Sequence, residues 1–393
     1  MSLRILHVTP YFTDAWAYGG IPRLATTLTT GLARRGHHVT VCTTDAHDRD
    51  SRLPSRPAAP AAPGIDVHVF PNWSNHLAYE LQLFTPIGLG RYLAGAVAQF
   101  DIAHIHGHRH WLEVAGARWC LRRRVPYVSA PNGTAARIER RQTLKHAWDT
   151  VWGCRDLASA DAVLAVSEAE RAQLLALGVE PQRIRLVPNP LDLDEFEPPP
   201  ERGRFRQRHD LANAPLVVFL GKITPRKRLD VLIAAMPRLH VRAARLVVAG
   251  NDMGGAAAAR RLAATLGIAD RTMFTGLVTG RARLDLLAAA DVVVYPSAHE
   301  VFGLVPLEAL LCGTPVVVAD DNGCGEVVGG LEGGQVVTLG DPAALAVAID
   351  SVLASPQAWR ARAALGAISV RERFGGSVVA EKVDALYREL LAR

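Results

Sequence analysis

The sequence has few cysteines and no pair of them at metal-binding spacing. Five cysteines are scattered along 393 residues without a C-x-x-C pair: Cys42, Cys120, Cys154, Cys312 and Cys324. This distribution argues against a zinc site and against a disulfide framework. It favours a reducing compartment.

Long apolar runs are also absent. No run approaches the roughly 18 residues that a membrane-spanning helix needs. The opening segment, MSLRILHVTPYF, is typical of a short strand and a turn, and it lacks the basic stretch and apolar core of a signal peptide. We therefore expect a cytoplasmic protein.

Two nucleotide-related signals are missing as well. The turn Tyr18–Arg23 contains Gly19 and Gly20 but no G-x-G-x-x-G, so a dinucleotide fingerprint is not supported. The net charge is +6, and part of the basic excess forms a cluster that we call the basic face: Arg122, Arg123, Arg124, Arg137, Arg140, Arg141 and Lys145. Because no aromatic platform or binding module accompanies this charge, nucleic acid is the least expected partner. An anionic membrane, an acidic substrate and a solvated surface stay open.

Strand-like apolar runs alternate with helical periodicity along the chain. In the first half, strands are expected at 3–9, 37–43, 66–70, 101–105, 126–130, 162–166 and 183–187. In the second half, they are expected at 216–220, 244–249, 271–274, 291–295 and 315–319. This alternation predicts an α/β protein with two doubly wound parallel sheets and right-handed crossovers.

The expected domains are residues 1–195 and 196–373, with a final helix at about 374–393. Pro198–Pro200 is predicted to be the linker between them. The Pro/Ala-rich stretch Ser51–Gly64 is predicted to be a flexible surface loop.

The stretch from His299 to Val318 is the most informative part of the chain. It predicts a strand, a loop holding Glu300, a turn over residues 301–304, and a short helix that carries Glu308. Backbone N–H groups at a helix N-terminus, together with the helix dipole, bind phosphate and other anions, and Gly303 allows close approach. This arrangement suits a nucleotide diphosphate sugar, although a pair of solvated glutamates would show the same spacing.

The same stretch, HEVFGLVPLEALLCGTPVVV, resembles the donor-site motif of family 4 of the retaining glycosyltransferases, and the resemblance extends over most of the chain. It implies the GT-B fold, in which two Rossmann-like domains face each other across a cleft. It places Glu300 by the donor sugar, Glu308 on the nucleotide ribose, and the amides of Phe302, Gly303 and Leu304 on the sugar and diphosphate. It also implies that the last helix returns to the N-terminal, acceptor-side domain, while the C-terminal domain binds the donor.

The basic loop Gly221–Asp230 follows the first strand of the second half. In the resembled family an arginine in this loop, and a lysine five residues later, neutralise the diphosphate. Here Lys222 stands at the arginine position and Lys227 at the lysine position. Lysine keeps the charge but loses the bidentate fork, for which Arg226 could compensate. Solvation alone is the alternative for this loop.

Gly19 and Gly20 match a glycine pair that faces the donor diphosphate in the family.

Four histidines alternate at 104, 106, 108 and 110. A metal site there would need extended geometry past Gly107, and we predict no metal. By resemblance, His106 reaches the donor sugar, while a purely structural histidine stays an alternative. Two strand-end loops, Pro131–Thr134 and Asp320–Glu326, are predicted to be binding loops or plain turns.

The predicted function is transfer of a sugar, with retention, from a nucleotide diphosphate sugar to a hydroxyl of a glycan, glycolipid or natural product. No cofactor or metal is expected, and no nucleic acid. Contact with the inner face of an anionic membrane stays open. The alternatives are another GT-B enzyme, such as a nucleotide-sugar epimerase, and a non-catalytic sugar-nucleotide-binding protein.

Overall fold

The computed structural model describes residues 1–393 except 14, 16–17, 54–61, 138–141, 212–213 and 321–322. The chain divides into two compact units, and each is described by itself. Unit 1 comprises Met1–Leu191 and Phe374–Arg393, and unit 2 comprises Asp192–Arg373. No helix within the described ranges is long and apolar enough to cross a membrane.

Unit 1 contains a parallel sheet of seven strands in the order β3-β2-β1-β4-β5-β6-β7. The strands are β1 (Arg4–Val8), β2 (His38–Thr44), β3 (Ile65–Phe70), β4 (Ile102–His106), β5 (Tyr127–Ala130), β6 (Ala162–Ala165) and β7 (Ile184–Leu186). The helices are α1 (Ile21–Arg34), α2 (Asn75–Leu81), α3 (Leu89–Ala96), α4 (Trp111–Arg123), α5 (Gln142–Trp148), α6 (Cys154–Ala158), α7 (Glu168–Ala176) and α16 (Gly376–Leu391).

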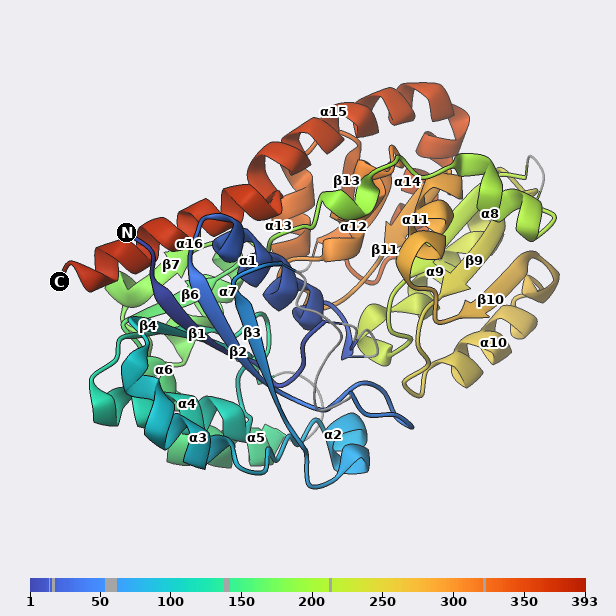
Figure 1. Ribbon diagram of the computed structural model, residues 1–393. Helices are drawn as coiled ribbons and strands as arrows, with labels where there is room; N and C mark the ends of the chain where they lie inside the picture. The colour runs from blue at the N-terminus through green and yellow to red at the C-terminus, as the bar shows by residue number, and fades with distance from the viewer. Residues whose placement is uncertain (14, 16–17, 54–61, 138–141, 212–213, 321–322) are drawn as a thin grey trace. The chain divides into compact units, whose positions relative to one another are not determined.

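Helices cover both faces of this sheet (Figure 1), because successive strand side chains point to opposite faces. Leu6 of β1 belongs to a core that includes residues of α3 and α4. Its neighbour Ile5 belongs to a second core that includes residues of α1 and α16. Both faces are therefore buried, as a parallel sheet requires.

The last helix, α16, lies against α1 although more than 300 residues separate them in sequence. A Cβ added at Gly31 would lie 2.7 Å from the Cβ of Ala380, so glycine permits the close approach of the two helices. Tyr387 is fully buried, and its hydroxyl lies 2.6 Å from Nδ1 of His104 in β4. The final segment is thus part of the core of unit 1.

Unit 2 contains a six-stranded parallel sheet in the order β10-β9-β8-β11-β12-β13. The strands are β8 (Leu216–Leu220), β9 (Arg245–Ala249), β10 (Thr272–Gly276), β11 (Val292–Tyr295), β12 (Val316–Asp320) and β13 (Gly334–Thr338). The helices are α8 (Arg202–Arg208), α9 (Leu229–Ala235), α10 (Ala256–Thr265), α11 (Gly280–Ala289), α12 (Leu304–Leu311), α13 (Gly323–Gly329), α14 (Pro342–Ala354) and α15 (Pro356–Phe374).

Both sheets have the doubly wound strand order, which confirms the predicted fold class. In each, the strand order reverses beside the first strand of the unit, between β1 and β4 in unit 1 and between β8 and β11 in unit 2. Loops at the carboxyl ends of strands diverge at such a switch point and leave room for a ligand. The functional residues are therefore sought at these two places.

Several local predictions were wrong. Residues 323–326, expected in a loop, belong to α13, whereas 321–322 lie outside the described residues. The single helix expected over 143–159 is divided by a π-helical turn at Asp149–Gly153. Pro198–Pro200 lies inside unit 2, where Arg281 donates to the carbonyl of Pro199 at 2.5 Å, rather than between the units. Most of the predicted loop Ser51–Gly64 falls outside the described residues.

Candidate functional site

Two loops meet at the switch point of unit 2. One follows β8 and contains Lys222, Arg226 and Lys227; the other follows β11 and contains His299 and Glu300. The amide of Ala298 donates to the carbonyl of Arg226 at 2.8 Å, and the Arg226 guanidinium donates to the carbonyl of His299 at 3.2 Å. These bonds hold the cations of one loop against the carboxylate of the other.

Lys227, Tyr295 and Glu300 form a compact cluster at this point. The Lys227 ammonium donates to the hydroxyl of Tyr295 and to Oε2 of Glu300, and the Tyr295 hydroxyl donates to the same Oε2 at 3.1 Å. The side chains of Lys227 and Glu300 are only 8% and 17% exposed. The lysine and the first glutamate, singled out separately in the sequence, are direct partners.

The charges of this cluster are set by competition between burial and neighbouring ions. Burial alone would raise the pKa of Glu300, but the Lys227 and Arg226 cations outweigh burial, and the pKa is lowered. Burial lowers the pKa of Lys227, an effect that Glu300 opposes. Burial, together with Lys227 and Arg226, lowers the pKa of Lys222 to about 8. The site thus concentrates positive charge beside one ionised carboxylate.

The turn after Glu300 leads into α12 as predicted. Gly303 is the N-cap residue of this helix and has φ of +80°, a conformation that favours glycine. A Cβ at Gly303 would lie 2.5 Å from Sγ of Cys324. Cys324 is itself fixed, because its amide donates to the carbonyl of Glu300 at 2.9 Å. Phe302 is buried and Leu304 is half-buried, so the backbone of the turn is held on both sides.

Glu308 lies on α12 but is completely buried, which rules out the solvated alternative for this glutamate. Its Oε2 accepts a hydrogen bond from Nη1 of Arg283 on α11. Arg283 also donates to Glu195 at 2.5 Å, so one guanidinium bridges two carboxylates. Arg283 could not be predicted from the sequence, because it lies 25 residues before Glu308 in a helix marked only by its apolar pattern.

At the switch point of unit 1, His106 is part of a histidine stack. His7 of β1 and His104 and His106 of β4 are all buried, with ring centroids 4.4–5.2 Å apart and interplanar angles of 14–25°. Nδ1 of His7 lies 2.9 Å from Nε2 of His106. Burial, followed by the nearby His110, lowers the pKa of His106 to about 3, so this imidazole is neutral at pH 7.

This stack is the one cluster within the described ranges with three potential metal ligands close together; one nitrogen of each ring lies within 4.8 Å of the others. Zinc ligands converge tetrahedrally, with nitrogen at about 2.0–2.1 Å from the metal. Instead, Nδ1 of His7 pairs with Nε2 of His106, and Nδ1 of His104 pairs with the hydroxyl of Tyr387. We therefore interpret the stack as packing between two strands.

The other two histidines of the predicted cluster have separate roles. The extended backbone ends at Gly107, whose φ is +81°, so His108 and His110 leave the strand. His110 caps α4 by accepting from the amide of Glu113 at 3.1 Å. His108 lies 2.5 Å from Glu113 and 3.2 Å from Asp149. Burial opposes its protonation, but these carboxylates prevail and raise the pKa of His108 to about 9.

One member of the basic face belongs to this buried network. Arg137 is exposed, but it donates to Oδ2 of the fully buried Asp149 at 2.7 Å, so its charge is paired. Arg140 and Arg141 lie outside the described residues. Arg122, Arg123 and Arg124 lie at the C-terminal end of α4 and are exposed. Of the described members of the basic face, Arg122, Arg123, Arg124 and Arg137 are exposed and Lys145 is half-buried.

The remaining predicted residues lie at strand-end loops of unit 1. Gly19 has φ of +98°, and Gly20 is the N-cap of α1. In the loop Pro131–Thr134, the amide of Gly133 donates to Glu170 at 2.5 Å. Burial raises the pKa of Glu170 to about 7. Glu170 on α7 thus fixes the loop from beneath, a contact that the sequence pattern does not indicate.

Two family models together match most of the chain. Residues 18–195 match the family model described as Glycosyltransferase Family 4, and residues 201–368 match the one described as Glycosyl transferases group 1. The D-inositol 3-phosphate glycosyltransferase of Xylanimonas cellulosilytica is 33% identical over 95% of this chain and 93% of its own length. That of Frankia alni is 32% identical over 95% of each chain.

Solved structures agree on the architecture. Sucrose-phosphate synthase from Thermosynechococcus elongatus is 25% identical, with a TM-score of 0.78 over 99% of each chain. HepE of Anabaena, solved in complex with UDP, is 20% identical, with a TM-score of 0.77 over 98% of this chain and 100% of its own. The latter likeness concerns the fold alone.

Proposed function

Since the chain belongs to glycosyltransferase family 4 and has the GT-B fold, we propose that it transfers a sugar from a nucleotide diphosphate sugar to an acceptor hydroxyl with retention of configuration. The observation that carries this proposal is the cluster at the switch point of unit 2. There Lys227 contacts Glu300, directly before the helix N-terminus at Gly303. HepE, which has the same fold, has been solved with UDP and with UDP-glucose.

In this proposal the diphosphate binds to Lys222, Lys227 and the amides of Phe302, Gly303 and Leu304. When the sugar leaves, negative charge develops on the β-phosphate. Fixed cations and helix N-terminal amides stabilise such charge without reorganisation, which is an effective form of catalysis. Arg226 adds a third cation to the same loop and contributes the guanidinium that position 222 lacks.

The glutamates bind hydroxyl groups. Glu300, ionised beside Lys227, accepts from the donor sugar, and Glu308 accepts from the ribose, with Arg283 holding its other side. For Gly19, Gly20 and His106 we propose the roles implied by the family resemblance. A buried, neutral His106 acts there as a positioning group through hydrogen bonding, not as a base.

Retention follows from a front-face reaction. The bond between the anomeric carbon and the phosphate oxygen breaks, the acceptor oxygen bonds to the same face of that carbon, and the departing phosphate accepts the acceptor proton. Retaining glycosidases instead place two carboxylates about 5–5.5 Å apart across the bond. Glu308 is bound to Arg283 and buried, so it is unsuited to act as the second member of such a pair.

The test is a thermal-shift panel of uridine, guanosine and adenosine diphosphate sugars, since a ligand that binds the folded state raises the melting temperature. The stabilising donor is then incubated with candidate acceptors, including D-inositol 3-phosphate, the compound in the relatives' name. An α-linked product from an α-configured donor, seen by NMR, supports the proposal. A β-linked product contradicts retention, and conversion of donor without acceptor into an epimer favours the alternative enzyme class.

Donor affinity should depend on pH through Lys222. With a pKa of about 8, Lys222 is cationic below that pH and loses its charge as the pH rises through it. The donor dissociation constant should therefore rise by up to about tenfold per unit above pH 8, because a diphosphate favours the charged form. Lys222→Arg stays charged and should remove this rise. The same slope in wild type and variant, measured by calorimetry, would exclude Lys222.

Replacing Glu308 by glutamine should weaken donor binding. A charged hydrogen bond contributes roughly 1.5–3 kcal/mol, which corresponds to about 10–150-fold in the donor Michaelis constant. Glu195→Gln is the matched control, because it removes the other carboxylate from Arg283 without altering the proposed ribose contact. If both variants lost stability but kept the wild-type Michaelis constant, Glu308 would not be a ribose ligand.

Transfer should be unaffected by a chelator. Lysine ammonium groups and helix N-terminal amides supply the charge stabilisation that divalent ions supply in other enzymes. Turnover measured before and after EDTA treatment should agree. Loss of turnover that zinc or magnesium restores would refute metal independence and would direct attention back to His7, His104 and His106.

Contact with an anionic membrane is a further part of the proposal for the case of a lipid-linked acceptor. It rests on Arg122, Arg123 and Arg124, which are exposed members of the basic face. Electrostatic attraction of this kind weakens as salt shortens the Debye length from about 30 Å to about 10 Å. Salt-dependent binding to anionic vesicles is therefore its signature.

A further inference from the structure

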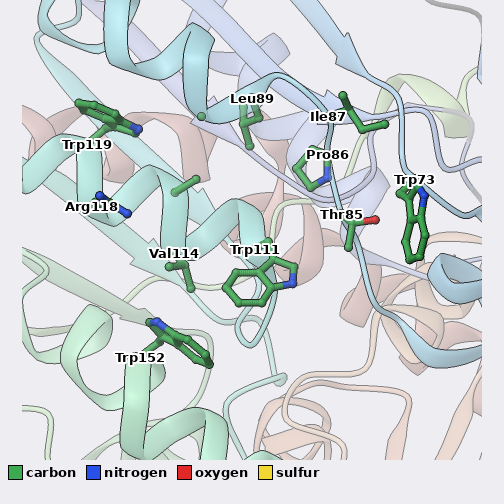
Figure 2. A pocket seen from close by; sticks show the side chains of 12 residues that line it. Trp73, Thr85, Pro86, Ile87, Leu89, Trp111, Val114, Arg118, Trp119 and Trp152 are labelled. Carbon is green, nitrogen blue, oxygen red and sulfur yellow. The ribbon is translucent and has the colours of Figure 1, made fainter.

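Unit 1 contains a cavity that the proposed donor site does not use. Its volume is about 560 Å³, within the range of small-molecule sites. Four of the chain's seven tryptophans line it (Figure 2): Trp73, Trp111, Trp119 and Trp152. They come from the segment after β3, from α4 and from the π-helical turn. No local stretch of sequence beside the basic face contains an aromatic platform, and the fold assembles one from separate segments.

The indole rings form pre-arranged walls. Trp111 contacts Trp148 and Trp152 edge to face, with centroids 4.8 and 5.2 Å away, and Trp148 contacts Trp152 at 5.0 Å. Trp73 is 72% exposed, and Figure 2 shows it opposite Trp111, with Thr85 between them. Rigid aromatic rings lose little conformational entropy on binding, so such walls are suited to recognition.

The cavity also offers polar groups. The Thr85 hydroxyl is buried and has no hydrogen-bond partner among the described residues. Arg118, on the same helix as Trp111, lines the cavity and is exposed. None of the twelve lining residues is acidic. A ligand would therefore meet flat apolar surfaces and a positive charge, with the unpartnered Thr85 hydroxyl buried just beneath the lining.

A sugar ring has this combination of surfaces, because its C–H face stacks on an indole while its hydroxyl groups bond to polar side chains. Trp73 and Ile87 of the lining are 72% and 57% exposed, so the test below includes a vesicle arm that distinguishes a bilayer from a glycan. We propose that the cavity binds a sugar residue that carries an acidic group, with the ring between Trp73 and Trp111 and the acid on Arg118. This inference rests on the proposed function, since the site would hold an acidic glycan portion of the acceptor away from the reacting hydroxyl.

The test measures binding directly. Full-length protein is applied to an array of uronic acid-containing, phosphorylated and neutral oligosaccharides, and hits are titrated by calorimetry. Trp73→Ala and Arg118→Gln should each weaken acidic glycan binding by about tenfold or more. Leu81→Ala and Arg91→Gln, exposed residues of α2 and α3 outside the lining, are the matched controls and should leave it unchanged. The uronic acid and phosphate arms identify which acid Arg118 prefers.

Three outcomes would overturn the proposal. The protein could bind no glycan on the array, or it could bind glycans with an affinity that neither cavity variant changes. It could also bind only vesicles of phosphatidylglycerol and phosphatidylcholine, in a way that depends on Trp73. The last outcome would assign the surface to a membrane. Donor hydrolysis, measured on the same preparations, should be normal in Trp73→Ala. If the wild-type protein did not hydrolyse any donor, the proposed function would be contradicted. The glycan titration would still test whether the cavity binds an acidic sugar.

Discussion

Replacing Lys227 by methionine is expected to lower turnover by roughly 10²–10³-fold, the effect of removing one preorganised group that stabilises developing negative charge. Methionine keeps the length and apolar stem of lysine but removes the cation. The donor Michaelis constant should change much less, because Lys222 and Arg226 still attract the diphosphate. Steady-state kinetics at saturating donor would measure the difference.

A second variant separates this effect from misfolding. Lys227→Met leaves the largely buried Glu300 without its cation, and breaking a buried pair costs about 3–5 kcal/mol. In the double variant Lys227→Met/Glu300→Gln the uncompensated charge is gone. Its melting temperature should recover, whereas its turnover should stay low. Recovery of turnover together with stability would show that Lys227 serves only to pair with Glu300.

The second large effect is expected for Gly303→Ala. Alanine at φ of +80° adds strain of about 1–3 kcal/mol. Its Cβ would also lie 2.5 Å from Sγ of Cys324, and overpacking of this kind costs about 1–3 kcal/mol. Because the turn holds the proposed diphosphate-binding amides, donor affinity should fall with stability. Urea unfolding and donor titration would measure the two losses.

Cys324→Ala provides the rescue. It removes the sulfur but leaves the Cβ, which would lie 3.3 Å from the new methyl group. The double variant should therefore regain the packing part of the stability and keep the strain part, while Cys324→Ala alone stays close to wild type. Wild-type stability in Gly303→Ala would mean that the turn can rearrange, and it would remove the argument that glycine is required there.

The strand–turn–helix around Glu300 and Glu308 could be predicted because its signals are local. Apolar runs mark β11 and β12, and the spacing of Leu307, Leu310 and Leu311 marks α12. The contacts of the same residues could not be predicted. Glu308 meets Arg283 because α12 packs against α11, and His106 meets His7 because β4 pairs with β1.

The errors have a similar cause. The segment around Cys324 has the composition of a loop, because it is rich in glycine and aspartate. The hydrogen bond from the amide of Cys324 to the carbonyl of Glu300 nevertheless fixes the first turn of α13. Arg137 is a surface residue, but its ion pair could not be predicted, because Asp149 lies in a π-helical turn that periodicity does not indicate. The tryptophans of the cavity come from three separate segments, so no window of sequence contains the pattern.

The position of α16 has a consequence for how the protein is made. Val379, Val383 and Tyr387 complete the core of unit 1, but they follow all of unit 2 in the sequence. Domains generally fold in order as they emerge from the ribosome, at about 5–20 residues per second. Most of unit 1 is synthesised before unit 2, but the last helix of unit 1 is synthesised after it. Until α16 has been synthesised, the nascent chain lacks the residues that pack with Leu28 and Leu32 of α1 in the core of unit 1.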